Sequence, residues 1–171
     1  MRRYSVPVVA VLAASLAVSA CGSSSKSKNS SSKPTQLPRA DFVQKADAIC
    51  TAGNKRLMAA GPSPKFNPAT ATKAQLASST KFFKALSQEI SSDVSGVSAL
   101  GEPSEAAPKQ AWHELRASLQ NTSVPNSQKL ISDARTGDLS AFRADFKTFS
   151  STDSIQTKDG KIIGFKVCGQ G

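Results

Sequence analysis

The sequence predicts an all-α domain, a four-helix bundle-like arrangement over residues 38–171 whose C-terminal tail is stapled by a disulfide. Apolar residues recur at three- and four-residue spacing in four segments, as they do on one face of a helix. Gly and Pro separate these segments, and two cysteines lie far apart within them. The length suits one domain of ordinary size.

The first helix is expected over residues 38–59. Pro38 suits a first turn, where its missing N–H would have no partner, and Asp41 lies near the positive end of the helix. The stripe that follows consists of Phe42, Ala46, Ile49, Gly53 and Leu57, with Cys50 at its edge. Gly61 and the prolines after it end the segment.

The second segment has the clearest helical pattern. Thr72 and Gln75 have the spacing of a capping box, in which each side chain bonds to the backbone N–H of the other residue. The apolar stripe comprises Leu76, Phe83, Leu86, Ile90, Val94, Val97 and Leu100, and we expect Ser, Lys, Gln and Asp on the opposite face. Gly101 and Pro103 end this helix.

A third helix is expected to begin near Pro108 and to end at Gly137. Its apolar positions are Trp112, Leu115, Leu119, Leu130, Ile131 and Ala134. Pro125 removes a backbone donor and crowds the carbonyl of Asn121. We therefore expect a bent third helix, or two short helices in its place.

The fourth helix is capped by Asp138 and carries Leu139, Phe142, Phe146 and Phe149 as core residues. The tail after it has a weaker helical pattern. Residues 158–161, Lys-Asp-Gly-Lys between β-prone residues, are compatible with a small hairpin. The alternative, which we favour, is an irregular return that brings Cys168 back to the first helix.

Residues 1–20 have the layout of a secretory signal peptide. Arg2 and Arg3 make the start positive, residues 6–18 are apolar and uncharged, and the small residues Ser19 and Ala20 follow. As a helix the apolar run would cover about 20 Å, less than the ~30 Å hydrocarbon core of a bilayer. A cleaved signal is therefore favoured over a permanent span.

The tetrapeptide Val18-Ser19-Ala20-Cys21 resembles the bacterial lipobox, in which small or apolar residues precede an obligatory cysteine. The resemblance implies that the Cys21 thiol becomes an S-diacylglycerol cysteine, with palmitate-type chains, and that cleavage falls between Ala20 and Cys21. Two or three acyl chains anchor a protein durably, whereas one chain binds only marginally. We expect a lipoprotein on the extracytoplasmic face of the cell membrane. An ordinary signal with an incidental cysteine is the alternative.

Residues 21–37 read as a flexible tether. They are mostly Ser, Lys, Asn, Gly and Pro, which bury too little apolar surface to offset the entropy of ordering. The tether contains Lys26, Lys28 and Lys33. These lysines either associate with anionic lipid headgroups or only keep the tether soluble.

The charge of the predicted domain argues against nucleic-acid binding. The whole chain carries +10, but residues 41–171 hold 16 of the 22 lysines and arginines and all 12 aspartates and glutamates, a net charge of +4. These charges are dispersed and form no basic helix face interleaved with aromatic residues.

Cys50 and Cys168 are expected to form a disulfide, since an isolated pair in an oxidising compartment usually does. The bridge would close a loop of about 117 residues, worth up to roughly 5 kcal/mol by chain entropy. A metal pair or a redox pair is less attractive, because the sequence has no Cys-x-x-Cys and only one histidine, His113.

We find no catalytic, cofactor-binding or metal-binding constellation in the sequence, and we expect a protein that is not an enzyme. His113 and Glu114 are adjacent in a helix, so they do not share a face. Gly-x-Ser-x-Gly, His-Glu-x-x-His, P-loop and Gly-x-Gly-x-x-Gly motifs are absent. His113 is interpreted as a partly exposed neighbour of a buried Trp112.

The stretches DFVQKADAIC, TGDLSAFRADF and GFKVCGQG resemble an uncharacterised family of small actinobacterial secreted proteins and lipoproteins. In that family an early helix ends near Asp-Ala-Ile-Cys, a later helix opens with Gly-Asp, and the chain closes with Gly-x-x-x-Cys-Gly. The corresponding residues here are 47–50, 137–138 and 164–169. The resemblance implies helices and paired cysteines, and it carries no activity.

The leading hypothesis is a non-enzymatic lipoprotein, a helical binding or scaffold domain held to the membrane at Cys21 with a partner in the cell envelope. A second hypothesis is a carrier of an apolar ligand or cell-wall lipid precursor, with Phe83, Trp112 and Phe146 lining a cavity between helices. A cell-wall hydrolase using His113 is the third and least supported.

Overall fold

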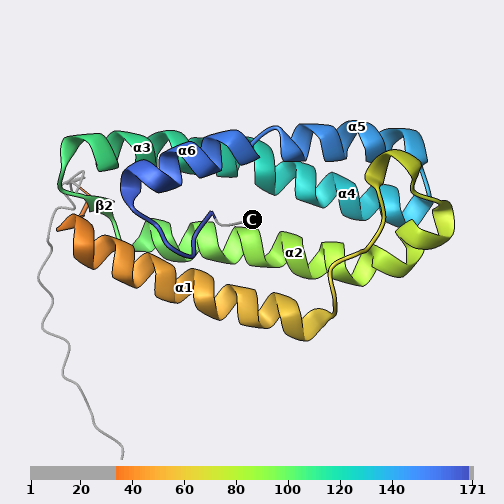
Figure 1. The fold of residues 1–171 in the computed structure, drawn as a ribbon, viewed down its shortest axis with the longest axis horizontal. Coiled ribbons are helices and arrows are strands. Elements are labelled where there is room, and N and C mark those ends of the chain that lie inside the picture. Colours follow the sequence, from red (N-terminus) through yellow and green to blue (C-terminus); the bar gives the residue numbers. More distant parts are fainter. Residues whose placement is uncertain (1–33, 170–171) are drawn as a thin grey trace, which may run out of the picture. The chain divides into compact units, whose positions relative to one another are not determined.

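The structure, a computed structural model, describes residues 34–169 (Figure 1). The expected signal peptide, the lipobox with Cys21, and residues 21–33 of the expected tether lie outside the described residues.

The helices of this part of the chain form four rods, where a rod is one long helix or a run of helical segments that follow one another end to end (Figure 1). The first two are α1 (Arg39–Ala60) and α2 (Lys73–Ala99), which are connected through a short 3-10 turn, η1 (Pro68–Thr70). The third runs through α3 (Ala106–Ser118), η2 (Leu119–Ser123) and α4 (Val124–Thr136). The fourth joins α5 (Leu139–Ser150) to α6 (Asp153–Ile163). The predicted all-α, bundle-like fold is confirmed.

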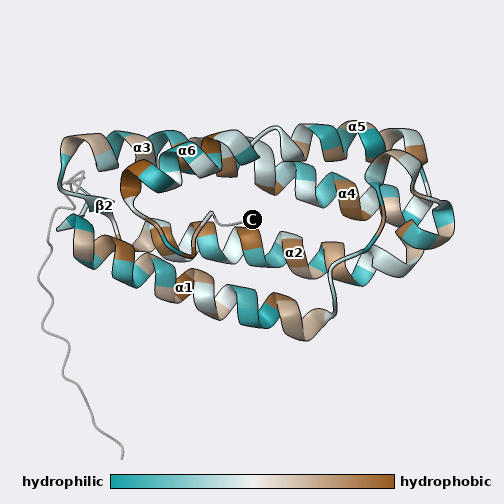
Figure 2. Ribbon diagram, viewed as in Figure 1, coloured by the Kyte–Doolittle hydropathy of each residue, from teal (hydrophilic) through white to brown (hydrophobic). Residues whose placement is uncertain are grey.

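The rods pack as successive antiparallel neighbours. Helix α1 contacts α2, and α2 contacts α4, while the fourth rod turns back along the third so that α5 meets α4 and α6 meets α3. Hydrophobic and hydrophilic residues alternate along each helix, as expected for helices that bury one face (Figure 2).

The predicted helix caps are formed. The Thr72 side chain accepts a hydrogen bond from the Gln75 N–H, and the Gln75 side chain accepts one from the Thr72 N–H, which completes the capping box. Asp138 accepts hydrogen bonds from the N–H groups of Ser140 and Ala141. These side chains satisfy backbone donors that would otherwise be unpaired at the start of α2 and α5.

Pro125 is accommodated without loss of the helical path. The π-helical segment η2 directly precedes it, and the Val124 N–H donates to the carbonyl of Leu119, five residues back. A π turn moves the hydrogen bonds from the fourth to the fifth preceding carbonyl, which makes room where proline cannot donate. A bend of this rod stays a prediction.

The expectation for the tail is wrong over residues 153–163, because this segment is the helix α6 rather than a hairpin or an irregular return. Asp159 and Ile163 are buried on its inner side, where α6 contacts α3. Gly164, at φ 97°, ends the helix in the left-handed conformation that glycine adopts most readily. The irregular return is confined to residues 165–169.

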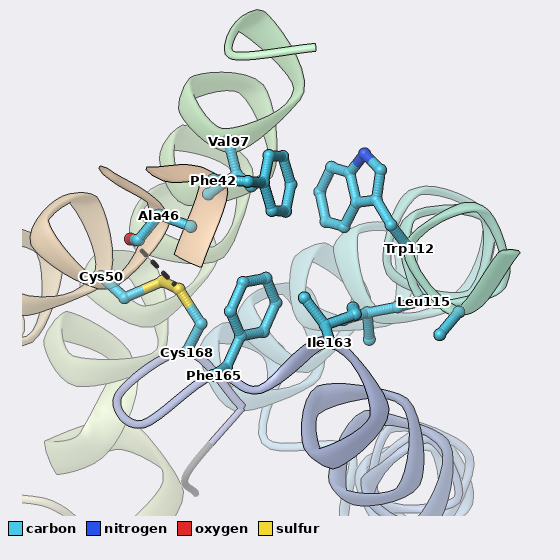
Figure 3. Packing of buried hydrophobic residues seen from close by; sticks show 10 residues of the cluster. Phe42, Ala46, Cys50, Val97, Trp112, Leu115, Ile163, Phe165 and Cys168 are labelled. Carbon is cyan, nitrogen blue, oxygen red and sulfur yellow. Dashed lines mark hydrogen bonds between the residues drawn. A yellow bond between two sulfur atoms is a disulfide. The ribbon is translucent and has the colours of Figure 1, made fainter. Parts of the chain in front are cut away.

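The core is divided into two clusters. One surrounds Phe42, whose ring meets Trp112 edge-on at 5.5 Å between centroids and stacks on Phe165 at 6.1 Å (Figure 3). The other surrounds Phe142, which contacts Phe83 at 5.6 Å and Phe146 at 5.8 Å. Of the four residues predicted for the core of this helix, Phe142 is buried, and Leu139, Phe146 and Phe149 are partly buried and pack against its cluster.

The last residues of the expected tether form a strand. Strand β1 (Gln36–Leu37) pairs in parallel with β2 (Glu102–Pro103), the segment that follows α2. The Glu102 N–H donates to the Thr35 carbonyl at 2.9 Å, and the Ser104 N–H donates to the Leu37 carbonyl at 2.8 Å. Gly101, at φ 97°, allows this approach, because a Cβ there would collide with the Thr35 carbonyl oxygen.

None of the helices within residues 34–169 combines the length and the apolar character that crossing a membrane requires.

Candidate binding cavity

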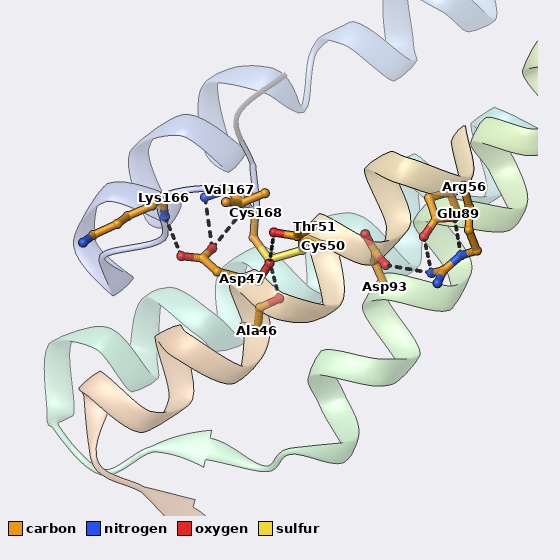
Figure 4. Close-up of a disulfide and its surroundings, with 10 residues drawn as sticks. All are labelled: Ala46, Asp47, Cys50, Thr51, Arg56, Glu89, Asp93, Lys166, Val167 and Cys168. Atoms are coloured by element: carbon orange, nitrogen blue, oxygen red, sulfur yellow. Dashed lines mark hydrogen bonds and ion pairs between the residues drawn. A yellow bond between two sulfur atoms is a disulfide. The ribbon is translucent and has the colours of Figure 1, made fainter. Parts of the chain in front are cut away.

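The predicted disulfide between Cys50 and Cys168 is present and joins α1 to the C-terminal tail (Figure 4). The Cα atoms of the two cysteines lie 5.4 Å apart, and both residues are buried. The bridge belongs to the same core cluster as Phe42 and Phe165, so it fixes the tail against the middle of the bundle.

Asp47 provides a second attachment for the tail (Figure 4). Its carboxylate accepts hydrogen bonds from the backbone N–H groups of Lys166, Val167 and Cys168, at 3.0–3.1 Å. Asp47 precedes Cys50 by about one helical turn, which places the carboxylate and the sulfur on neighbouring parts of α1. The short tail is therefore held by a covalent bond and by a charged acceptor.

A cavity of about 320 Å³ lies between the rods beside the tail. Every helical rod contributes to its wall. The apolar part of the wall consists mainly of Leu57, Leu86, Ile90, Val94, Val97, Trp112, Leu115, Leu119, Phe149, Phe165 and Val167. Asn54, Asp153 and Gly169 line the cavity and are exposed, so they mark where it meets solvent.

The cavity agrees only in part with the carrier hypothesis. Trp112 lines it, as expected, but Phe83 and Phe146 do not: both pack around Phe142 in the other core cluster. Helix α2 instead contributes one face to the cavity wall. The residues of this face recur at a spacing of three or four, from Leu86 to Val97.

Two carboxyl groups interrupt this apolar face. Glu89 and Asp93 both line the cavity from α2, and Arg56 of α1 meets them (Figure 4). The Arg56 guanidinium donates to both oxygens of Glu89, at 2.7 and 3.1 Å, and lies 3.8 Å from Oδ1 of Asp93. The Glu89 side chain is 10% exposed, whereas that of Arg56 is 55% exposed, so the cation approaches from the solvent side.

Gly53 makes room for the two carboxyl groups. A Cβ at this position would collide with Oε1 of Glu89 and would lie 2.7 Å from both oxygens of Asp93. Gly53 is a predicted member of the buried stripe of α1, and its missing side chain lets both carboxyl groups lie against the helix.

Burial, followed by the hydrogen bond with Glu89 and the negative charge of Glu89, raises the pKa of Asp93 to about 7, although the charge of Arg56 acts to lower it. Asp93 therefore gains or loses its proton near neutral pH. Its Oδ1 atom is shielded from solvent and has no hydrogen-bond partner among the described residues.

The side of the cavity opposite α2 is polar where the third and fourth rods meet. Ser123 Oγ and Thr152 Oγ1 are 3.1 Å apart, and the Gln156 Nε2 donates to Thr152 Oγ1 at 2.9 Å. Ser123 and Gln156 line the cavity, and these hydrogen bonds engage Ser123 Oγ and Gln156 Nε2 within the protein.

His113 does not line the cavity. Its Nε2 lies 2.8 Å from Oε2 of Glu102, and Lys109 and Gln36 contact the other oxygen at 3.1 Å each. These partners, His113 first, lower the pKa of Glu102 to about 2. The His113 side chain is 47% exposed beside the buried Trp112, as interpreted from the sequence, and the network fastens β1 to the bundle.

Sequence reasoning missed the carboxyl groups in the cavity wall. It assigned the Asp of the second helix to the face opposite the apolar stripe, but Asp93 lies in that stripe, between Ile90 and Val97. The signal was present: Glu89 and Asp93 are four residues apart and adjoin Ile90 and Val94, which are stripe positions.

No group of three or more His, Cys, Asp and Glu side chains within residues 34–169 is arranged to hold a metal ion. Comparisons of the chain with models of known protein families, with curated proteins and with solved structures gave no match.

Proposed function

We propose that this chain is a lipid-anchored, extracytoplasmic, non-enzymatic binding protein whose helical domain holds a small ligand with an apolar body in the cavity between the rods. The cavity carries the proposal: about 320 Å³ is at the small end of the range for ligand sites, and its wall is mainly apolar with a few polar groups.

The anchor part of the proposal is supported by the sequence. The lipobox-like residues 18–21 end an apolar signal-like run and begin a polar tether. A thioether-linked diacylglycerol on Cys21 would leave the domain outside the cytoplasmic membrane at the end of this tether.

The anchor is tested by membrane fractionation and metabolic labelling with a palmitate analogue. We expect the wild-type protein and a Ser23→Ala control to be labelled and to sediment with membranes. Cys21→Ala, or treatment with globomycin, should remove the label or arrest processing. Equal labelling of Cys21→Ala and wild type would contradict the anchor.

The cavity is tested by calorimetric titration of the purified protein with octanol, a small neutral probe with an apolar chain. Ile90→Trp places a larger side chain in the cavity wall and should abolish octanol binding. Ile162→Trp makes the same change at an exposed position of α6 outside the wall and should bind octanol like wild type. Equal binding by the two variants would contradict a ligand in this cavity.

A further inference from the structure

We propose that the cavity selects an amphiphilic cation, a molecule whose apolar body fills the cavity and whose basic nitrogen pairs with the carboxyl groups of Glu89 and Asp93. The inference rests on the proposed function, because it names the ligand class of the same cavity.

The charge of the wall is the first argument. Three carboxyl groups line the cavity, those of Glu89 and Asp93 from α2 and that of Asp153 from α6, and the wall within the described residues includes no lysine or arginine. An anionic ligand would bring further negative charge against these groups. A positive group, in contrast, gains attraction that the low dielectric of a partly closed site strengthens.

The incomplete pairing of the cluster is the second argument. Arg56 satisfies both oxygens of Glu89, but it remains 3.8 Å from Asp93, beyond hydrogen-bonding distance. One guanidinium therefore faces two carboxyl groups, and Oδ1 of Asp93, the shielded oxygen nearest Arg56, has no hydrogen-bond donor. Asp93 also lines the cavity, so a basic nitrogen that binds there would bring a second positive charge to the cluster.

The positioning of the two carboxyl groups against α1 is the third argument. Gly53 lets Glu89 and Asp93 pack against α1, and Arg56 holds Glu89 there. The acceptors are thus positioned before any ligand arrives, which reduces the entropy lost on binding. Asp153, exposed at the opening, gives an approaching cation a first attractive charge.

The apolar wall defines the rest of the ligand. Leu57, Ile90 and Leu119 come from three different rods, and all three line the cavity. A flexible alkyl or aromatic body of modest size fits a volume of about 320 Å³. The ligand class is therefore an amine with one apolar body, rather than a phosphate-headed lipid.

The test compares octylamine, octanol and octanoate, which share one chain and differ in charge. Trp112 is the only tryptophan and lines the cavity, so its fluorescence reports occupancy, and native mass spectrometry counts the bound probe. We expect octylamine to bind about tenfold more tightly than octanol at neutral pH, as a hydrogen bond to a charged group would give, and octanoate to bind most weakly.

The outcomes separate the two proposals. Equal affinities of octylamine and octanol, or tighter binding of octanoate, would overturn the cation preference and leave the apolar cavity as the ligand site. Binding of none of the three probes would overturn the proposed function as well.

Single-site variants assign the preference to the cluster. Asp93→Asn keeps the size of the side chain and should reduce octylamine affinity to the level of octanol, while octanol binding stays unchanged. Asp145→Asn, a matched change at a carboxyl group that pairs with Lys129 outside the cavity wall, should keep the preference. A preference that survives in both Asp93→Asn and Glu89→Gln would refute the role of these carboxyl groups.

Discussion

Removal of the disulfide should lower the stability of the domain far more than it disturbs the tail. Cys50 and Cys168 are separated by 118 positions, and chain entropy assigns about 5 kcal/mol to the closure of a loop of this size. Measured stabilisation by a disulfide is usually smaller than this value. We therefore expect the double variant Cys50→Ala/Cys168→Ala to lose about 2–5 kcal/mol of its free energy of unfolding. The free energy of unfolding of a typical domain is about 5–15 kcal/mol, so this loss is a large share of the total stability.

Urea unfolding followed by circular dichroism measures this loss. With a slope of about 2 kcal/mol per molar urea, the midpoint should fall by roughly 1–2.5 M. Wild-type protein reduced with dithiothreitol keeps both sulfur atoms and separates the loss of the cross-link from the loss of packing. If the reduced protein and the double variant both unfold within about 1 kcal/mol of oxidised wild type, the loop-closure reasoning is refuted.

Four further results are expected. The raised pKa of Asp93 contributes stability that is fully present below about pH 3.8 and is lost as pH rises towards about 7, so Asp93→Asn should flatten the decline of the urea midpoint between about pH 4 and pH 7. The lowered pKa of Glu102 stabilises the fold above pH 4.5 and the benefit is lost as pH falls towards 2, so Glu102→Ala should lower the melting temperature at neutral pH and weaken its acid dependence. Gly53→Ala should weaken octylamine binding in calorimetric titration through its collision with Glu89, although alanine favours the helix by about 1 kcal/mol. Asp47→Ala should cost about 1–3 kcal/mol in urea unfolding and speed hydrogen exchange of the tail amides, since three N–H groups lose their acceptor.

The helices that local sequence signals define were predictable. The capping box at Thr72, the cap at Asp138 and the apolar stripes each depend on residues within a few turns of one another. The pairing of Cys50 with Cys168 also followed, because they are the only cysteines of the domain.

Features that depend on distant packing were not predictable in the same way. Helix α6 contains Gly160 and β-prone residues, so its local preference is weak, and the burial of Ile163 against α3 outweighs that preference. The cavity depends on how side chains from all four rods fail to fill the space between them, which no single segment encodes. Asp93 shows that a charge within an apolar stripe is a useful signal of a polar site.

The short pairing of β1 with β2 would have a mechanical consequence if the domain is anchored at Cys21 as proposed, because the pairing lies between residue 34 and α1. A pull on residue 34 reaches the hydrogen bonds that join Thr35 and Leu37 to the segment after α2 before it reaches α1. We expect these few bonds to break before those of α1, which would free residues 34–37. The cross-linked tail and the cavity beside it lie further from the point of the pull. The pairing of β1 with β2 would thus protect the interior of the domain from a pull on its N-terminal side.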